Sequence, residues 1–312
     1  MNYLSIFLIS LVAAAVGAPL IMNLLISLKS RQSIHKDAPE NHQVKAGTPT
    51  MGGLIVLLGA LVGLGAAGFS GDKGALPSVL LLLGFGLIGF VDDYVVPKMM
   101  AGKRGLGWKP KLLMQVAFGL GALYLSQPNL PPWAMATGLF FILFFTNAYN
   151  FSDGLDGLSG LLGVFLALGF FLLQPSAAPI ALIAGFAVFL CYNAPPAKVF
   201  MGDVGALAIG SVFGLLFFQY TYVSSPDFVA YISNSRFGIG FVLSLVMIAE
   251  LVPPPLQIFW VKVFKKRLFP YTPIHHAWEK AGWPETRVTI MFVMVQLACT
   301  MTAILAESAR RA

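Results

Sequence analysis

The chain has 312 residues, of which 57% are hydrophobic and only 11% are charged, and its formal net charge at pH 7 is +7. Soluble domains are about 45–50% apolar and about 25% charged, so this composition excludes soluble globular, disordered and coiled-coil proteins and favours an integral membrane protein. The two cysteines, Cys191 and Cys299, both lie in apolar stretches, which excludes a disulfide framework and a Cys-x-x-Cys metal site.

Ten stretches nearly free of charge are long enough, or almost long enough, to cross a membrane as helices. We expect these spans at residues 2–28, 50–70, 75–96, 111–126, 133–149, 157–173, 177–193, 204–223, 237–261 and 288–306. The first has no basic segment before it, so we expect a retained helix rather than a cleaved signal peptide. The run Pro253–Pro255 removes three consecutive backbone donors and predicts a kink or an unwound stretch in the ninth span. The predicted fold is one all-α polytopic membrane domain over residues 1–312.

The basic residues predict how the chain lies in the membrane. Lys111 and the loops 29–49, 97–110, 150–156, 194–203 and 262–287 carry sixteen of the twenty lysines and arginines. The positive-inside rule places these loops in the cytoplasm and both termini outside. Topology therefore explains the net positive charge, and no nucleic-acid partner is needed.

Five aspartates fall at the predicted cytoplasmic ends of spans, where carboxylates are costly unless they have a function or a partner. They are Asp92, Asp93, Asp153, Asp156 and Asp203. A single one would most simply cap a helix, as Asp153 and Asp203 could. Five on one side, with Asn147 and Asn150 beside them, favour a functional site instead.

The chemistry of these residues indicates a hard cation and a phosphorylated ligand. Oxygen ligands without cysteine suit Mg²⁺, which usually takes one or two carboxylates together with substrate phosphates and water. Several lysines precede or follow the same span ends and could neutralise a diphosphate. These are Lys45, Lys98, Lys109 and Lys111.

Five motifs together resemble a known family. They are GTPTMGG (47–53), FVDDY (90–94), NAYNFSDGLDGL (147–158), FMGDVG (200–205) and PIHHAWEKAGWPE (273–285). The chain is similar, from about residue 45 to 290, to the phospho-N-acetylmuramoyl-pentapeptide transferases, a branch of the polyprenyl-phosphate N-acetylhexosamine-1-phosphate transferases. One departure is Ala277, which stands where the family usually has a third consecutive histidine.

The resemblance implies a reaction and a location. UDP-N-acetylmuramoyl-pentapeptide and undecaprenyl phosphate would give UMP and the first lipid-linked peptidoglycan precursor. The resemblance also implies Mg²⁺, ten transmembrane helices with the active site at the cytoplasmic face, a homodimer, and a place in the bacterial inner membrane.

The resemblance also implies roles for single residues. Asp203 would bind the metal, and Asp92 would act as the base with support from Asp93. The implied catalytic residues are Asp92, Asp93, Asp203 and His276. The implied substrate-binding residues are Lys45, Thr50, Lys111, Asn150, Asp153, Asp156, Phe200 and His275.

Two other functions stay open at the level of sequence. A sister enzyme that moves N-acetylglucosamine 1-phosphate would share the aspartates but lack GTPTMGG and the PIHH ending. An ion-coupled transporter would place its acids near the middle of the membrane, whereas Glu250 is the only acid in the middle of a predicted span. Direct attack by the lipid phosphate and a covalent phospho-sugar intermediate are both compatible with these residues.

Overall fold

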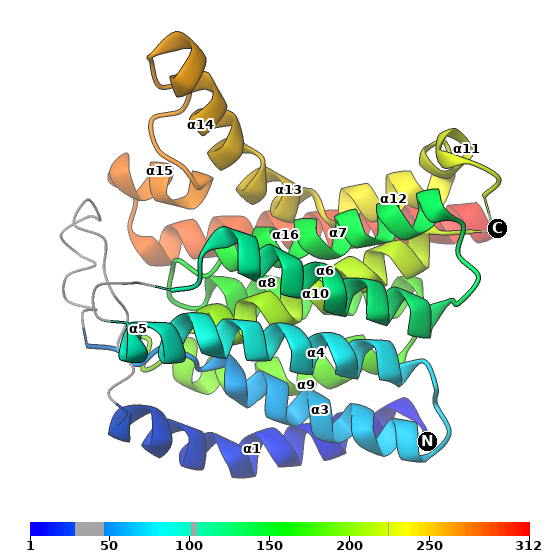
Figure 1. Cartoon of the computed structure of the whole chain (residues 1–312), viewed down its shortest axis with the longest axis horizontal. Coiled ribbons are helices and arrows are strands. Elements are labelled where there is room, and N and C mark those ends of the chain that lie inside the picture. The colour runs from blue at the N-terminus through cyan, green and yellow to red at the C-terminus, as the bar shows by residue number, and fades with distance from the viewer. Residues whose placement is uncertain (29–46, 101–104, 224) are drawn as a thin grey trace.

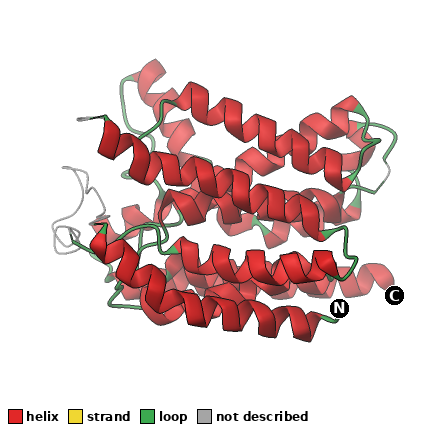
Figure 2. Cartoon of the chain, turned by 60° about the horizontal axis from the view of Figure 1, so that its bottom comes forward, coloured by secondary structure: helices red, strands yellow, loops and turns green. Residues whose placement is uncertain are grey.

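The computed structural model describes residues 1–28, 47–100, 105–223 and 225–312, and every regular element in them is helical. The long helices run alongside one another in a bundle (Figures 1 and 2). They are α1 (Tyr3–Ser27), α3 (Gly53–Phe69), α4 (Ala75–Phe90), α6 (Trp108–Ser126), α7 (Pro132–Phe151), α8 (Leu158–Leu173), α9 (Ala177–Asn193), α10 (Gly202–Thr221) and α16 (Glu285–Arg311). The shorter elements are η1 (Val91–Val95), α5 (Val96–Met99), α11 (Phe228–Ile232), α12 (Ser235–Leu243), α13 (Leu245–Leu251), α14 (Pro253–Phe264) and α15 (Ile274–Lys280).

Each of the ten predicted apolar stretches contains a helix within the described residues. Six helical segments are long and apolar enough to cross a membrane: Tyr3–Ser27, Ala75–Met99, Pro132–Phe151, Gly202–Thr221, Leu245–Phe264 and Glu285–Arg311. The helices α3, α8 and α9 are equally apolar but have only 16 or 17 residues. The protein is thus an all-helical, multi-pass membrane protein, and a total of ten crossings stays a prediction.

The helix α10 lies at the centre of the bundle. In its most apolar window, 94% of the residues are buried, more than in any other candidate span of the described chain. Glycines allow the neighbouring backbones to approach it: Gly210 lies against the backbone of Phe145, and Gly214 against that of Ile142 in α7. Small residues of this kind are typical of close helix contacts in membranes. This close packing fixes the position of α10, and with it that of Asp203 in its first turn, relative to α7.

The ninth apolar stretch is interrupted, as the proline run predicts. The helix breaks at Ser244 and again at Val252, and α14 begins at Pro253, where missing backbone donors cost a helix nothing. Beyond this second break, α14 leaves the bundle and projects away from it, with α15 below (Figure 1). The prediction of a kinked or unwound ninth span is confirmed.

Candidate active site

The polar motifs meet at one end of the bundle, where α4, α6, α7 and α10 carry them. The helix α4 widens at its end into the π-helical turn η1, which holds Asp92 and Asp93. A π-turn is rare and places side chains differently from a regular helix, and such turns are frequent at functional sites. Lys111 stands in the first turn of α6, and Asn150 in the last turn of α7.

The ammonium group of Lys111 joins two of these carboxylates. Its Nζ lies 2.7 Å from Oδ2 of Asp203 and 3.2 Å from Oδ2 of Asp92. The three side chains are 15–23% exposed, so they are neither fully buried nor freely solvated. Asn150 donates its Nδ2 hydrogen to Oδ1 of Asp203 over 2.8 Å, and the backbone N–H of Leu106 donates to Oδ1 of Asp92 over 2.6 Å. Four separate helix ends thus share one hydrogen-bonded cluster.

Asp93 belongs to the same cluster through the backbone of the FMGDVG segment. Its Oδ2 accepts a hydrogen bond of 3.3 Å from the N–H of Val204. A side chain built at Gly202 would meet both Oδ2 of Asp93 and Oγ1 of Thr50, at 2.8 and 2.6 Å. Gly202 also has a φ of +70°, which glycine adopts without strain. Residue 202 is therefore glycine for two physical reasons, and Thr50 lies next to the aspartates.

Backbone hydrogen bonds join the GTPTMGG segment to the FMGDVG segment, about 150 positions further along the chain. Gly52 N–H donates to the carbonyl of Phe200 over 2.7 Å, and Gly53 N–H to that of Met201 over 3.0 Å. In return, Phe200 N–H donates to the carbonyl of Pro49 over 3.0 Å. The predicted site residue Phe200 is buried beneath these contacts, at 2% exposure. The two motifs form one structural unit.

Asp153 is held by this unit from the other side. Its Oδ2 accepts a hydrogen bond of 3.0 Å from the N–H of Gly202, and its Oδ1 accepts one of 2.8 Å from the hydroxyl of Ser159. Burial raises the pKa of Asp153 to about 6, although these two hydrogen bonds favour the ionised form. Its carboxyl group therefore changes charge closer to neutral pH than an exposed aspartate does.

Asp156 ties together three further segments. Its Oδ2 accepts a hydrogen bond of 2.9 Å from Ala197 N–H, and its own N–H donates to Oε1 of Glu285 over 2.6 Å. Beside it, Asn193 accepts from the N–H of Gly157 and donates to the carbonyl of Val199. These contacts connect the loop 152–157 to the segment before α10 and to the start of α16.

The two histidines each pair with a glutamate. His275 Nδ1 lies 2.7 Å from Oε2 of Glu250, and both side chains are fully buried. His276 Nδ1 lies 2.7 Å from Oε2 of Glu279 and is 23% exposed. A side chain at residue 154 would overlap Nε2 of His275. Because residue 154 is glycine, the imidazole ring can pack next to Asp153. The PIHH segment therefore packs directly on the NFSDGLDGL loop.

The structure brings eleven of the twelve predicted site residues to this end of the bundle, and Lys45 lies outside the described residues. Asp153 and Asp203 do not hold the N-cap positions of α8 and α10, which Gly157 and Met201 occupy, and Asp203 lies in the first turn of α10. Sequence reasoning gave no role to Asn193, Glu250 or Glu285. In the sequence, Glu250 stands out only as an acid in the middle of an apolar span, and Glu285 only as the last residue of the PIHHAWEKAGWPE motif.

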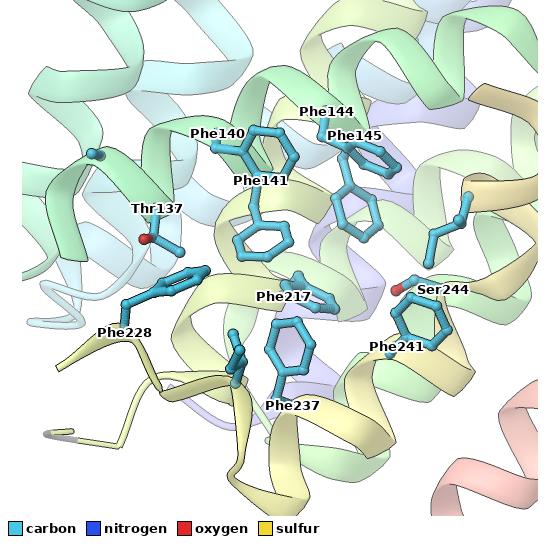
Figure 3. A pocket seen from close by; sticks show the side chains of 13 residues that line it. Thr137, Phe140, Phe141, Phe144, Phe145, Phe217, Phe228, Phe237, Phe241 and Ser244 are labelled. Carbon is cyan, nitrogen blue, oxygen red and sulfur yellow. The ribbon is translucent and has the colours of Figure 1, made fainter. Parts of the chain in front are cut away.

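A second feature lies further along the same helices. A cavity of about 540 Å³ between α7, α10, α11 and α12 is lined mainly by phenylalanines, including Phe141, Phe217 and Phe237 (Figure 3). Its polar lining residues are Thr137 and Ser244. Such a cavity offers no group for catalysis and suits an apolar chain.

The chain resembles known proteins over most of its length. Residues 75–221 match the family described as glycosyl transferase family 4, and residues 45–57 match signature 1 of the phospho-N-acetylmuramoyl-pentapeptide-transferases. A relative of that name from Heliobacterium modesticaldum is 36% identical, over 95% of this chain and 95% of its own. Relatives of the same name from Staphylococcus haemolyticus and Staphylococcus aureus are each 34% identical, over 91–93% of this chain and 92–94% of their own.

Proposed function

The chain belongs to the phospho-N-acetylmuramoyl-pentapeptide transferase family, and we propose that it carries out the family's reaction at the cluster around Lys111. It transfers phospho-N-acetylmuramoyl-pentapeptide from the UDP-linked donor to undecaprenyl phosphate and releases UMP. The observation that carries the proposed site is the contact of Asp92 and Asp203 with a single ammonium group, that of Lys111, while Asn150 donates a hydrogen bond to Asp203.

The residues of this cluster fit Mg²⁺. Two carboxylates, Asp92 and Asp203, share the single ammonium group of Lys111, so an added cation would offset the excess negative charge. Among the described residues no group of three or more Asp, Glu, His or Cys side chains could hold a metal alone. This is compatible with Mg²⁺, which usually binds one or two protein carboxylates and completes its coordination shell with substrate phosphate and water. Asp203 would hold it, and the metal would neutralise charge on the diphosphate.

The protein side chains then have separate tasks. Lys111 is placed to neutralise a phosphate oxygen, while Asn150 keeps Asp203 oriented. Asp92 is held by Leu106 N–H and Lys111, so it presents its carboxylate in one orientation and can position the acceptor phosphate or take its proton. We place the uridine end of the donor beside Phe200, Asn150 and Asp153, the described residues that match uridine-contacting positions of the family.

We favour direct attack by the lipid phosphate over a covalent enzyme intermediate. A phosphate monoester is already ionised near neutral pH and needs only shielding from the donor's negative charge. Mixing stoichiometric, lipid-free enzyme with the donor and Mg²⁺ tests this. Direct attack predicts no burst of UMP, whereas a burst equal to the enzyme concentration would demonstrate the two-step route.

Supplying the purified protein with different donors tests the function itself. We expect UMP release only when undecaprenyl phosphate and UDP-N-acetylmuramoyl-pentapeptide are both present. Release with UDP-N-acetylglucosamine instead would favour the sister transferase. Solute uptake into vesicles without any UMP release would favour the transporter.

The remaining assignments concern the membrane and the assembly. Both termini lie at one end of the bundle, opposite α14 and α15 (Figure 1), which supports an even number of crossings. We place the termini outside and the motifs in the cytoplasm, where the nucleotide donor is available. We also propose a homodimer, in line with the family resemblance, and the mass of the detergent-solubilised protein tests it.

A further inference from the structure

A second, basic pocket lies beside the candidate active site. It has a volume of about 800 Å³ and lies between α14, α15 and the segment that joins them. Its lining includes three cationic side chains, Lys262, Arg267 and Lys280, together with Gln257, Tyr271 and Thr272. Unlike the phenylalanine cavity, this pocket offers positive charge and hydrogen-bonding groups. It therefore suits an anionic ligand.

The pocket is held in shape by specific contacts. Oε1 of Gln257 accepts hydrogen bonds from the N–H groups of Leu268 and Phe269, at 3.0 and 2.9 Å, and this fixes the joining segment on α14. The ammonium of Lys280 stands 4.8 Å from the centre of the Tyr271 ring, a cation–π contact that fixes the opposite wall. The lining is therefore a formed surface of the described chain.

Within the described residues, no ion pair joins the three cations of the pocket to an acidic side chain. Elsewhere in the described chain Lys111, Arg310 and Arg311 each pair with a carboxylate. No such pair involves Lys262, Arg267 or Lys280 in the residues that the structure covers, and all three are exposed. Three like charges around one hollow repel one another, so an anion bound among them would relieve that repulsion.

The pocket also adjoins the proposed active site. The Tyr271 ring of its wall lies edge-on to the ring of His276, with 6.3 Å between the two centres. His276 in turn lies against Gly154, next to Asp153. A five-residue peptide spans up to about 17 Å when extended, and the pocket is linked to Asp153 through the neighbouring contacts of Tyr271, His276 and Gly154.

We propose that this pocket binds the carboxylates of the donor's peptide, an inference that rests on the proposed function. A pentapeptide has at least one carboxylate, at its C-terminus, and any acidic side chains add to its negative charge. Lys262, Arg267 and Lys280 recognise those carboxylates, while the reacting phosphates lie at Lys111 and Asp203. The pocket thereby distinguishes a peptide-bearing donor from a bare UDP-sugar.

A double-mutant-type cycle, in which the pocket residues of the protein and the carboxylates of the donor are changed separately and together, tests this proposal. The full-length protein, in bilayer discs of uncharged lipid, is assayed for UMP release with the natural donor and with a donor whose peptide carboxylates are amidated. For the unaltered protein, amidation is expected to raise KM about three- to tenfold with little change in kcat, as for a small group of exposed ion pairs. In the double variant Lys262→Gln/Lys280→Gln, KM for the natural donor is expected to rise by a similar factor. Amidation should then have no further effect.

The matched control is Lys266→Gln, an exposed cation just after α14 that does not line the pocket. It is expected to leave KM for both donors within about twofold. Equal KM changes for natural and amidated donors in the double variant would overturn the proposal, because the effect would not involve the carboxylates. An effect seen only in discs of anionic lipid would assign the pocket to a lipid headgroup and would overturn it too. Turnover of the amidated donor by the unaltered protein reports on the transferase function separately.

Discussion

At the scale of single residues, charge compensation organises the site. Asp92 and Asp203 are partly exposed, and each carboxylate is bonded to Lys111 and to a further donor, the N–H of Leu106 or the amide of Asn150. Carboxylates at membrane depth are tolerated only with such partners. The same need explains the full burial of His275 with Glu250.

Replacing Asp203 with asparagine tests the proposed metal site. The side chain keeps its size and loses the charge that would hold Mg²⁺, so we expect kcat to fall by about 100-fold or more at saturating Mg²⁺. UMP release measures it. The matched control is Asp72→Asn, an exposed aspartate beyond α3, which should retain full activity. Near-normal turnover of Asp203→Asn would contradict the metal assignment.

Glu250 offers a second test at a position that sequence reasoning left without a role. Glu250→Ala would leave the buried His275 Nδ1 without its partner, and we expect the free energy of unfolding to fall by about 1–3 kcal/mol. Glu250→Gln keeps an acceptor oxygen, so its thermal unfolding midpoint should stay closer to that of the unaltered protein while kcat falls about tenfold. If both variants match the unaltered protein in both measurements, the pair does not orient His275.

At the scale of elements, the glycine contacts at the ends of α3, α4 and α10 position the cluster. Gly53 and Gly205 meet with their backbones in contact, and Gly89 lies directly against the backbone of Asp203. No side chain separates these three helices where they carry the motifs. The approach lets one ammonium group reach carboxylates on two different helices.

Two alanine substitutions in α3 test that contact. A methyl group at Gly53 would overlap the backbone of Gly205, whereas one at Gly65 has nothing within 4 Å. We expect Gly53→Ala to lower both the thermal midpoint and kcat, because α3 and α10 must separate. Gly65→Ala should match or exceed the parent's stability, since alanine is favoured over glycine in a helix by about 1 kcal/mol. Equal behaviour of the two variants would show that the close approach is not needed.

The elements also show where sequence reasoning works and where it ends. Apolar runs and the Pro253–Pro255 break are strong local signals, so the helices and the interruption of the ninth stretch could be predicted. The central place of α10 could not be, because lipid and protein interior are both apolar and the pattern does not distinguish them. The π-turn at Asp92 and the His275–Glu250 pair depend on packing between distant segments. Motifs pointed to the candidate site residues, whereas the fold shows which side chains and backbone groups they contact.

At the scale of the whole molecule, orientation decides whether the site can meet its donor. Cys191 and Cys299 are first replaced by alanine, and a single cysteine is then placed either at Met100 or at Gln127. Both positions are exposed; Met100 directly follows α5, and Gln127 directly follows α6. In intact cells, a membrane-impermeant thiol reagent should label the cysteine at 127 and not the one at 100. Labelling of both after permeabilisation is the control. The reverse pattern would place the motifs outside, away from cytoplasmic nucleotide.

The ammonium of Lys111 gives the resting site a tethered counter-ion. If Asp203 holds a divalent cation, that cation would compete with the Lys111 ammonium, which the chain itself supplies at high effective concentration. Displacement would free the ammonium for the next anion to enter, so metal and diphosphate would favour each other's binding without any movement of the helices. Electrostatic competition with Lys111, rather than a conformational change, would then set the order in which the metal and the diphosphate bind.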